Sequence, residues 1–354
     1  MTSQTWSIKQ IKAATTITDV LSCLNILSAI LSIFLIFRYS TRLMRDYRIH
    51  LLNISLMILM CDLCATFFIR PYVILPVSAA CTVGVLSLPL KNMFGVESAT
   101  FIVVVLQAFF VSASLTSVTN ATLHRYISVA KSQPSFPKFL NSKRIVFSFM
   151  IFLEFIWPLI TIIPALKVDL APKDFVQKNI EMHPEEMKCA LKKPCFYLRV
   201  EDPIKMLNDI RYVIPYNLLI LFCIVSNGVL LVLCWKLIWE MKANVMSART
   251  LRMQKILLIT LTAQTLIPFA VLGLCGILIL VGAFFNSQST YIFAHLGLLI
   301  GSIHSVVNFL VLLISVPQFT RGLRDDFNYI VGNRKVIVSN RVFVSTSNQA
   351  LTII

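Results

Sequence analysis

The stretch TDVLSCLNILSAILSIFLIF (residues 18–37), followed at once by the basic segment RYSTRLMRDYRIH (residues 38–50), decides the fold class. About 20 predominantly apolar residues in a helix cross the ~30 Å of hydrocarbon in a bilayer. Six further stretches of this kind follow, with soft edges, at residues 51–78, 99–122, 145–166, 213–235, 256–283 and 291–316. The pattern predicts an all-α membrane protein, a seven-transmembrane helix bundle.

The charges between these stretches predict the orientation of the bundle. Four alternate segments, residues 38–50, 123–144, 236–255 and the tail from 317, hold 19 cations against four acids. The largest of the other connections, residues 167–211, holds nine cations and eight acids. Because basic connections are retained in the cytoplasm, we expect the N-terminus outside and the C-terminus inside.

Composition excludes a soluble domain. The chain has 57% hydrophobic and 14% charged residues, a net charge of +16 and a mean hydropathy of +0.80. The cations are dispersed over short loops beside the spans, which indicates orientation and attraction to anionic lipid rather than nucleic-acid binding. We expect residues 1–330 to form the receptor-like membrane domain and residues 331–354 a cytoplasmic tail.

The apolar run over residues 51–98 could be divided into two spans. The segment before this run, 38–50, and the segment after the third stretch, 123–144, are both basic. Both are therefore predicted on the same side of the membrane, and an even number of crossings must separate them. We therefore predict one crossing in this run, at 51–78, and an outer connection at 79–98.

Six of the nine cysteines fall inside predicted spans. Cys61 and Cys64 have the spacing of a redox or zinc motif, but no second pair accompanies them in the lipid, so we predict no metal site and no cofactor. Cys81, Cys189 and Cys195 lie on the predicted outer face, where disulfides persist. Three pairings are open, of which we prefer Cys81 with Cys195.

Asp62 and Glu154 lie inside the second and fourth stretches. A charge at this depth requires a partner, protonation or a water-filled cavity. Either residue suits a buried switch in a receptor, and we assign Asp62 that role; the alternative is a transporter or proton-coupled carrier that uses both.

Arg125 and Tyr126 directly follow the third stretch, at the predicted cytoplasmic boundary. An arginine there resembles the acid-Arg-Tyr element of rhodopsin-like receptors, which implies contact with a G protein. His124 stands where the acid is usual, so an acid–arginine lock within the helix is not expected.

The sixth stretch carries Gln264 and Pro268. Proline removes a backbone hydrogen bond and kinks a helix, so we expect Pro268 to act as a hinge for its cytoplasmic half. Depth alone selects the candidate ligand-binding residues of the outer half: Gln107, Ser114, Tyr212, Tyr216, Gln264, Tyr291 and His295. After Pro317, apolar residues recur at helical spacing, which predicts a short amphipathic helix along the inner surface.

The chain resembles the nematode serpentine chemosensory receptors, particularly class H, from residue 18 to about 330. The resemblance is carried by the order and setting of Pro71-Tyr72, Pro76, Gly84, Pro184-Glu185-Glu186, Pro194-Cys195, Gln264, Pro268 and the run from His304 to Pro317. It implies a G-protein-coupled receptor of sensory neurons for small environmental molecules. One departure is Pro317-Gln318-Phe319, where the family has Pro-Tyr-Arg.

Together these features predict a chemoreceptor of the plasma membrane of sensory cilia that binds an odorant- or pheromone-like molecule and signals to a heterotrimeric G protein. We do not expect an enzyme, because no catalytic or phosphate-binding motif is present. An odour-gated channel with its N-terminus inside is opposed by the charge distribution. Internal repeats, typical of transporters, are also missing from the sequence.

Overall fold

A computed structural model describes residues 8–40, 45–74, 79–82, 84–131, 142–163, 181, 195–197, 203–240, 248–284, 296–297 and 299–330.

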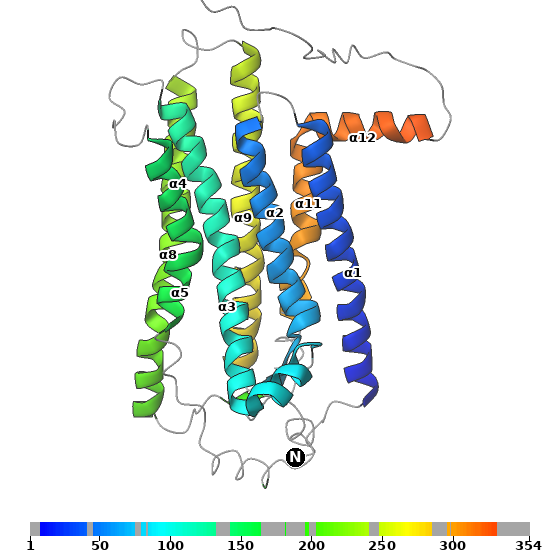
Figure 1. Cartoon of the computed structure of the whole chain (residues 1–354), viewed down its shortest axis with the longest axis vertical. Helices are drawn as coiled ribbons and strands as arrows, with labels where there is room; N and C mark the ends of the chain where they lie inside the picture. Colours follow the sequence, from blue (N-terminus) through cyan, green and yellow to red (C-terminus); the bar gives the residue numbers. More distant parts are fainter. Residues whose placement is uncertain are drawn as a thin grey trace, which may run out of the picture.

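The described residues form an up-and-down helix bundle (Figure 1). Lipid offers no hydrogen bonds, so a spanning segment must pair its backbone groups internally, as a helix does. The spanning elements are α1 (Ile8–Tyr39), α2 (Arg45–Leu63) with the π-helix η2 (Cys64–Phe68), α3 (Ser87–Ala130), α4 (Lys143–Ile151) with η4 (Phe152–Ile156) and α5 (Trp157–Ile162), α8 (Pro203–Glu240), α9 (Ala248–Phe284) and α11 (His304–Ser315), which residues 296–303 precede. The predicted seven-helix architecture is confirmed.

Three described helical stretches are long and apolar enough to cross a membrane: Thr15–Tyr39, Tyr47–Phe68 and Leu218–Trp239. A fourth is obtained if Leu299–Ser315 and Pro317–Asn328, which meet at 92°, are counted together. Large apolar side chains also point away from the bundle, with Phe147, Val232 and Ile314 exposed by 64%, 67% and 77%. Such a surface is stable in a bilayer and not in water.

The amphipathic helix predicted after the last span is α12 (Pro317–Ile330). It leaves the end of α11 nearly at a right angle, beside the end of α1, and we call this end of the bundle the α12 end (Figure 1). Phe319 of α12 is fully buried in an apolar cluster that includes Leu51 of α2 and Leu258 of α9. This cluster joins the helices at the α12 end.

A three-stranded antiparallel sheet lies at the opposite end, which we call the sheet end. Its strands are β1 (Pro71–Ile74), β2 (Ala79–Thr82) and β3 (Cys195–Tyr197), in the order β1-β2-β3. The helix of the second span therefore ends at Phe68, ten residues before the expected limit at 78. Prolines at 71 and 76 cannot donate helical hydrogen bonds, and an apolar strand has the same hydropathy as an apolar helix.

The third helix begins earlier than expected, at Ser87 in place of residue 99. Gly95, with φ 81° and ψ 172°, interrupts it and separates a short first segment from the spanning part. Only glycine adopts this backbone conformation without a steric penalty. The connection predicted at 79–98 is thus a strand followed by a bent helix start.

Candidate functional site

Arg125 lies near the α12 end of α3 and is only 5% exposed. Its Nη2 donates to the backbone carbonyl of Gln254 on α9 at 3.3 Å, and its guanidinium carbon lies 5.7 Å from the centre of the Tyr47 ring on α2. Tyr126 beside it is half-buried against the apolar cluster. Arg125 therefore joins α2, α3 and α9, and we call these contacts the arginine closure.

A histidine pair lies beside the arginine closure. The ring centres of His50 on α2 and His124 on α3 are 4.3 Å apart, with the planes tilted by 36°. Sequence reasoning noted the missing acid before Arg125 but missed His50, whose spacing of three from Tyr47 places both on one helix face. His50 on α2 thus contacts His124, which stands where rhodopsin-like receptors usually have an acid.

Asp62 holds a break in the seventh span. Residues 302–303 form a turn, and α11 begins at His304. The backbone N–H of Ser305 donates to Oδ2 of Asp62 at 2.6 Å, and Asp62 is 2% exposed. The first N–H groups of a helix have no partner within it and attract negative charge, so this carboxylate caps α11.

Asn25 of α1 holds the other side of the same break. Its Nδ2 donates to the carbonyl of Ser302 at 2.8 Å, and the residue is fully buried. We call Asn25, Asp62, Ser302 and Ser305 the break site. Sequence reasoning selected Asp62 alone, because only a charged residue is conspicuous within an apolar stretch.

Gln264 connects α9 to α11 close to the break site. Its Nε2 donates to Oδ1 of Asn308 at 2.9 Å, while its Oε1 is buried without a hydrogen-bond partner among the described residues. The NH₂ group of this predicted ligand-binding residue therefore links two helices, and its oxygen is free to accept a hydrogen bond from a ligand.

Glu154 lies in the π-helix η4 and is 5% exposed. Its Oε1 accepts from Nδ2 of Asn53 on α2 at 2.5 Å, and its Oε2 accepts from Nδ2 of Asn120 on α3 at 2.9 Å. Asn120 also donates to the carbonyl of Met150 at 3.1 Å. Two asparagines from different helices, Asn53 and Asn120, are therefore the partners of this buried acid.

A further amide joins α3 to α8. Nδ2 of Asn227 donates to Oγ1 of Thr119 at 2.7 Å, and Thr122 donates to Oδ1 of Asn227 at 2.9 Å. Asn227 is 1% exposed. A lone asparagine in an apolar stretch was the only sequence signal for this contact.

Of the other predicted site residues, the structure describes the side chains of Ser114 and Gln107. Ser114 is buried and donates to the carbonyl of Val111 at 2.8 Å, whereas Gln107 is half-buried with its Oε1 lacking a partner among described residues. Tyr212, Tyr216 and Pro268 lie within helices α8 and α9, but their side chains are outside the described part. Tyr291 and His295 also lie outside it.

The backbone register of the sheet places two of the outer cysteines opposite each other. Cys81 of β2 is paired directly with Cys195 of β3. Cys61 and Cys64 are free thiols, and the described residues contain no group of three or more metal-binding side chains.

The fold is that of rhodopsin-type seven-helix receptors. The chain matches the crystal structure of squid rhodopsin with a TM-score of 0.56 and 13% sequence identity, over 93% of this chain and 89% of that chain. No curated protein matches the sequence. At this identity the likeness establishes the fold.

The family model described as "Serpentine type 7TM GPCR chemoreceptor Srh" matches residues 9–320, and the chain belongs to that family. It is a multi-pass membrane protein and a G-protein-coupled chemoreceptor, a class that binds small molecules and couples to G proteins. The resemblance to class H is confirmed.

The transporter alternative is not favoured. Family and fold are those of receptors. The two carboxylates that motivated it, Asp62 and Glu154, accept hydrogen bonds from neighbouring helices. These contacts account for buried acids without a transport pathway.

Proposed function

We propose that the receptor binds a small, largely apolar molecule of odorant or pheromone type between the helices on the sheet-end side of the bundle. The oxygens of Gln107 and Gln264, buried without hydrogen-bond partners among the described residues, support this proposal. Ligand pockets are mostly apolar with a few such polar groups. Ser114, Tyr212, Tyr216, Tyr291 and His295 complete the proposed set.

In this proposal the sheet end faces outward and the α12 end faces the cytoplasm. The four basic segments of the sequence adjoin helix termini that meet at the α12 end (Figure 1). The positive-inside rule then assigns that end to the cytoplasm. The proposed location is the plasma membrane of sensory cilia, which tagged receptor in sensory neurons would test.

The arginine closure carries the proposed signalling mechanism. Arg125 joins α3 to α9 in the arrangement described, which we assign to the resting receptor. A ligand favours the active arrangement only to the extent that it binds that arrangement more tightly. Separation of α9 from α3, with Pro268 as hinge, frees Arg125 and Tyr126 to contact the G protein.

Arg125→Ala tests this role. We expect normal surface expression and loss of signalling, because the guanidinium is needed after the closure opens. Arg144→Ala, which removes an exposed cation on α4 at the same end, is the matched control. Activators come from a ligand panel screened by calcium response in cells expressing the chain. Undiminished signalling of Arg125→Ala in such cells would falsify the role of Arg125.

The outer cysteines belong to the same proposal. We propose a disulfide between Cys81 and Cys195, because antiparallel strands bring residues in register to distances that a disulfide can span. The bond would fix the long outer loop to the first outer hairpin, over the sheet end.

A further inference from the structure

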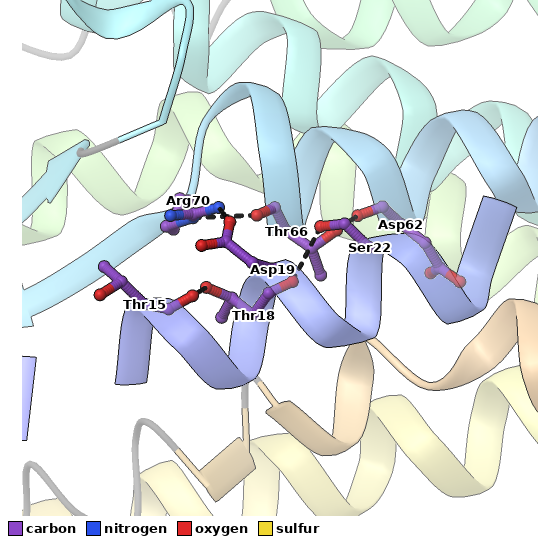
Figure 2. A network of polar contacts seen from close by, with 7 residues as sticks. All are labelled: Thr15, Thr18, Asp19, Ser22, Asp62, Thr66 and Arg70. Carbon is purple, nitrogen blue, oxygen red and sulfur yellow. Dashed lines mark hydrogen bonds and ion pairs between the residues drawn. The ribbon is translucent and has the colours of Figure 1, made fainter. Parts of the chain in front are cut away.

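A chain of polar contacts connects the sheet end of α1 with α2 and η2 (Figure 2). On α1 it includes Thr18, whose carbonyl accepts from Ser22, and Asp19. On the facing helix Asp62, Thr66 and Arg70 follow at intervals of four residues. Figure 2 shows these side chains lying along the boundary between the two helices.

Arg70 is the centre of this chain. Its Nε donates to the carbonyl of Thr66 at 3.0 Å, and its Nη2 forms an ion pair with Oδ1 of Asp19. The Arg70 side chain is 15% exposed and that of Asp19 is 60% exposed. The cation is therefore held in place by its surroundings, while the acid lies on the outer surface of the bundle and can leave.

The backbone of Arg70 is also unusual. Its φ of 48° places it in the left-handed region, and no other non-glycine residue of the described chain has a positive φ. Residues held in sparsely populated conformations tend to occur where a structure switches or binds. Arg70 lies at the junction between η2 and β1, so the strained residue is where the second span turns into the sheet.

The segment between β2 and α3 is bonded to the end of η2. The N–H of Gly84, two residues after β2, donates to the carbonyl of Ile69 at 2.9 Å, and that of Leu86 donates to the carbonyl of Phe68 at 3.0 Å. A Cβ atom at Gly84 would overlap the Phe68 carbonyl, so only glycine permits this approach. The chain thus leaves η2 for β1 through Arg70 and returns to the end of η2 directly after β2, so we expect the sheet and the end of η2 to move together.

The same helix leads to the break site. Thr66 donates from Oγ1 to the carbonyl of Asp62 at 2.8 Å, and Asp62 caps α11 through Ser305. A π-helix contains one residue more per hydrogen-bonded turn than an α-helix, so η2 can change register without breaking the span. Arg70, Thr66 and Asp62 thus form one route from the sheet to α11.

We propose that Asp19 and Arg70 form a latch that couples the outer sheet to the break site and holds the resting receptor. While the latch is closed, α1 fixes the pivot between η2 and the sheet. When Asp19 releases Arg70, the sheet and η2 move together and shift Asp62 relative to α11. The inference rests on the proposed function, because it gives the outer sheet a part in activation.

The first test measures conformation without a G protein. Full-length receptor in lipid nanodiscs carries spin labels, introduced as unnatural amino acids, at the exposed residues Lys131, directly after α3, and Arg252 on α9. Asp19→Asn and Arg70→Ala each break the latch, and we expect both to lengthen the distance between the labels. The reversed pair, Asp19→Arg with Arg70→Asp, should restore the wild-type distance, because aspartate tolerates the left-handed backbone.

The second test measures basal GTPγS loading by a panel of G proteins in membranes. An exposed ion pair shifts an equilibrium by about two- to fivefold, so we expect basal loading per surface receptor to rise by that factor in each single variant. Asp325→Asn, which removes an exposed acid of α12, should leave loading unchanged. If wild type loads no G protein even with an activator from the ligand panel, the proposed function fails, and the label distances still decide the latch.

Wild-type distances and loading in both single variants, or failure of the reversed pair to restore them, would overturn the proposal. If a single variant does not reach the cell surface, Asp19→Ser and Arg70→Gln remove the charge and keep a polar side chain at each position. Altered label distances in these milder variants support the latch. Unaltered distances in both variants would show that the ion pair has only a structural role, and would overturn the proposal.

Discussion

Replacing Glu154 with glutamine should destabilise the receptor although the two side chains have nearly the same shape. The carboxylate accepts from Asn53 at one oxygen and from Asn120 at the other. An amide has one accepting oxygen, and its NH₂ group would face the NH₂ of one asparagine. Glu154→Gln therefore loses one hydrogen bond and places two donors against each other.

The magnitude follows from burial. Glu154 is 5% exposed, so water cannot replace the lost partner. Hydrogen bonds to charged groups contribute about 1.5–3 kcal/mol, and we expect a loss of about this size in the free energy of unfolding. For a chain of this size the midpoint of thermal unfolding should fall by roughly 2–4 °C.

A thiol-reactive dye that reports the buried Cys64, Cys223 and Cys234 measures this midpoint in detergent or nanodiscs. Adding Asn53→Asp to Glu154→Gln should recover most of the loss, because the new carboxylate accepts from the glutamine NH₂ while Asn120 keeps its acceptor. An undisturbed midpoint in Glu154→Gln, or no recovery in the double variant, would refute the reasoning.

Two further predictions concern the ends of the bundle. Cys81→Ser and Cys195→Ser should each lower surface expression, since loss of a disulfide that closes a loop costs about 2–4 kcal/mol, and non-reducing peptide mapping should recover the two cysteines in one cross-linked pair. Gly322→Ala should displace α12 and speed its hydrogen exchange, because the new methyl group would overlap the ring of Tyr39, whereas Gly228→Ala, which meets no neighbour, should leave exchange unchanged.

The disulfide prediction has its control in Cys189→Ser, which removes the third outer cysteine and should leave the cross-linked pair intact. Recovery of Cys189 in the cross-link would contradict the pairing. Wild-type exchange of α12 in Gly322→Ala would show that the Tyr39 ring moves aside without cost.

Sequence reasoning could predict the spans because lipid sets their length and composition. It found Asp62, Glu154 and Arg125 for the same reason, since a charge beside or within an apolar run is conspicuous. It placed the end of the second span too late, at residue 78, because hydropathy does not distinguish an apolar strand such as Pro71–Ile74 from a helix.

The partners of these residues could not be predicted. His50 with His124, Asn25 with Ser302, and Asp19 with Arg70 are far apart in sequence, and each pair depends on how two helices are rotated and aligned. Nothing in a single helix specifies the face that its neighbour covers. Ser and Thr side chains add no clear signal, because many bond only to carbonyls of their own helix.

The amino-acid sequence by itself determined that the chain crosses the lipid as seven helices and where its basic connections lie, because those properties depend on local composition. The tertiary structure alone decided which buried polar groups meet: Asp62 at the start of α11, Glu154 between two amides and Arg125 against α9. In a low-dielectric interior an unpaired polar group is costly, so the packing that satisfies these groups also fixes the arrangement of the helices.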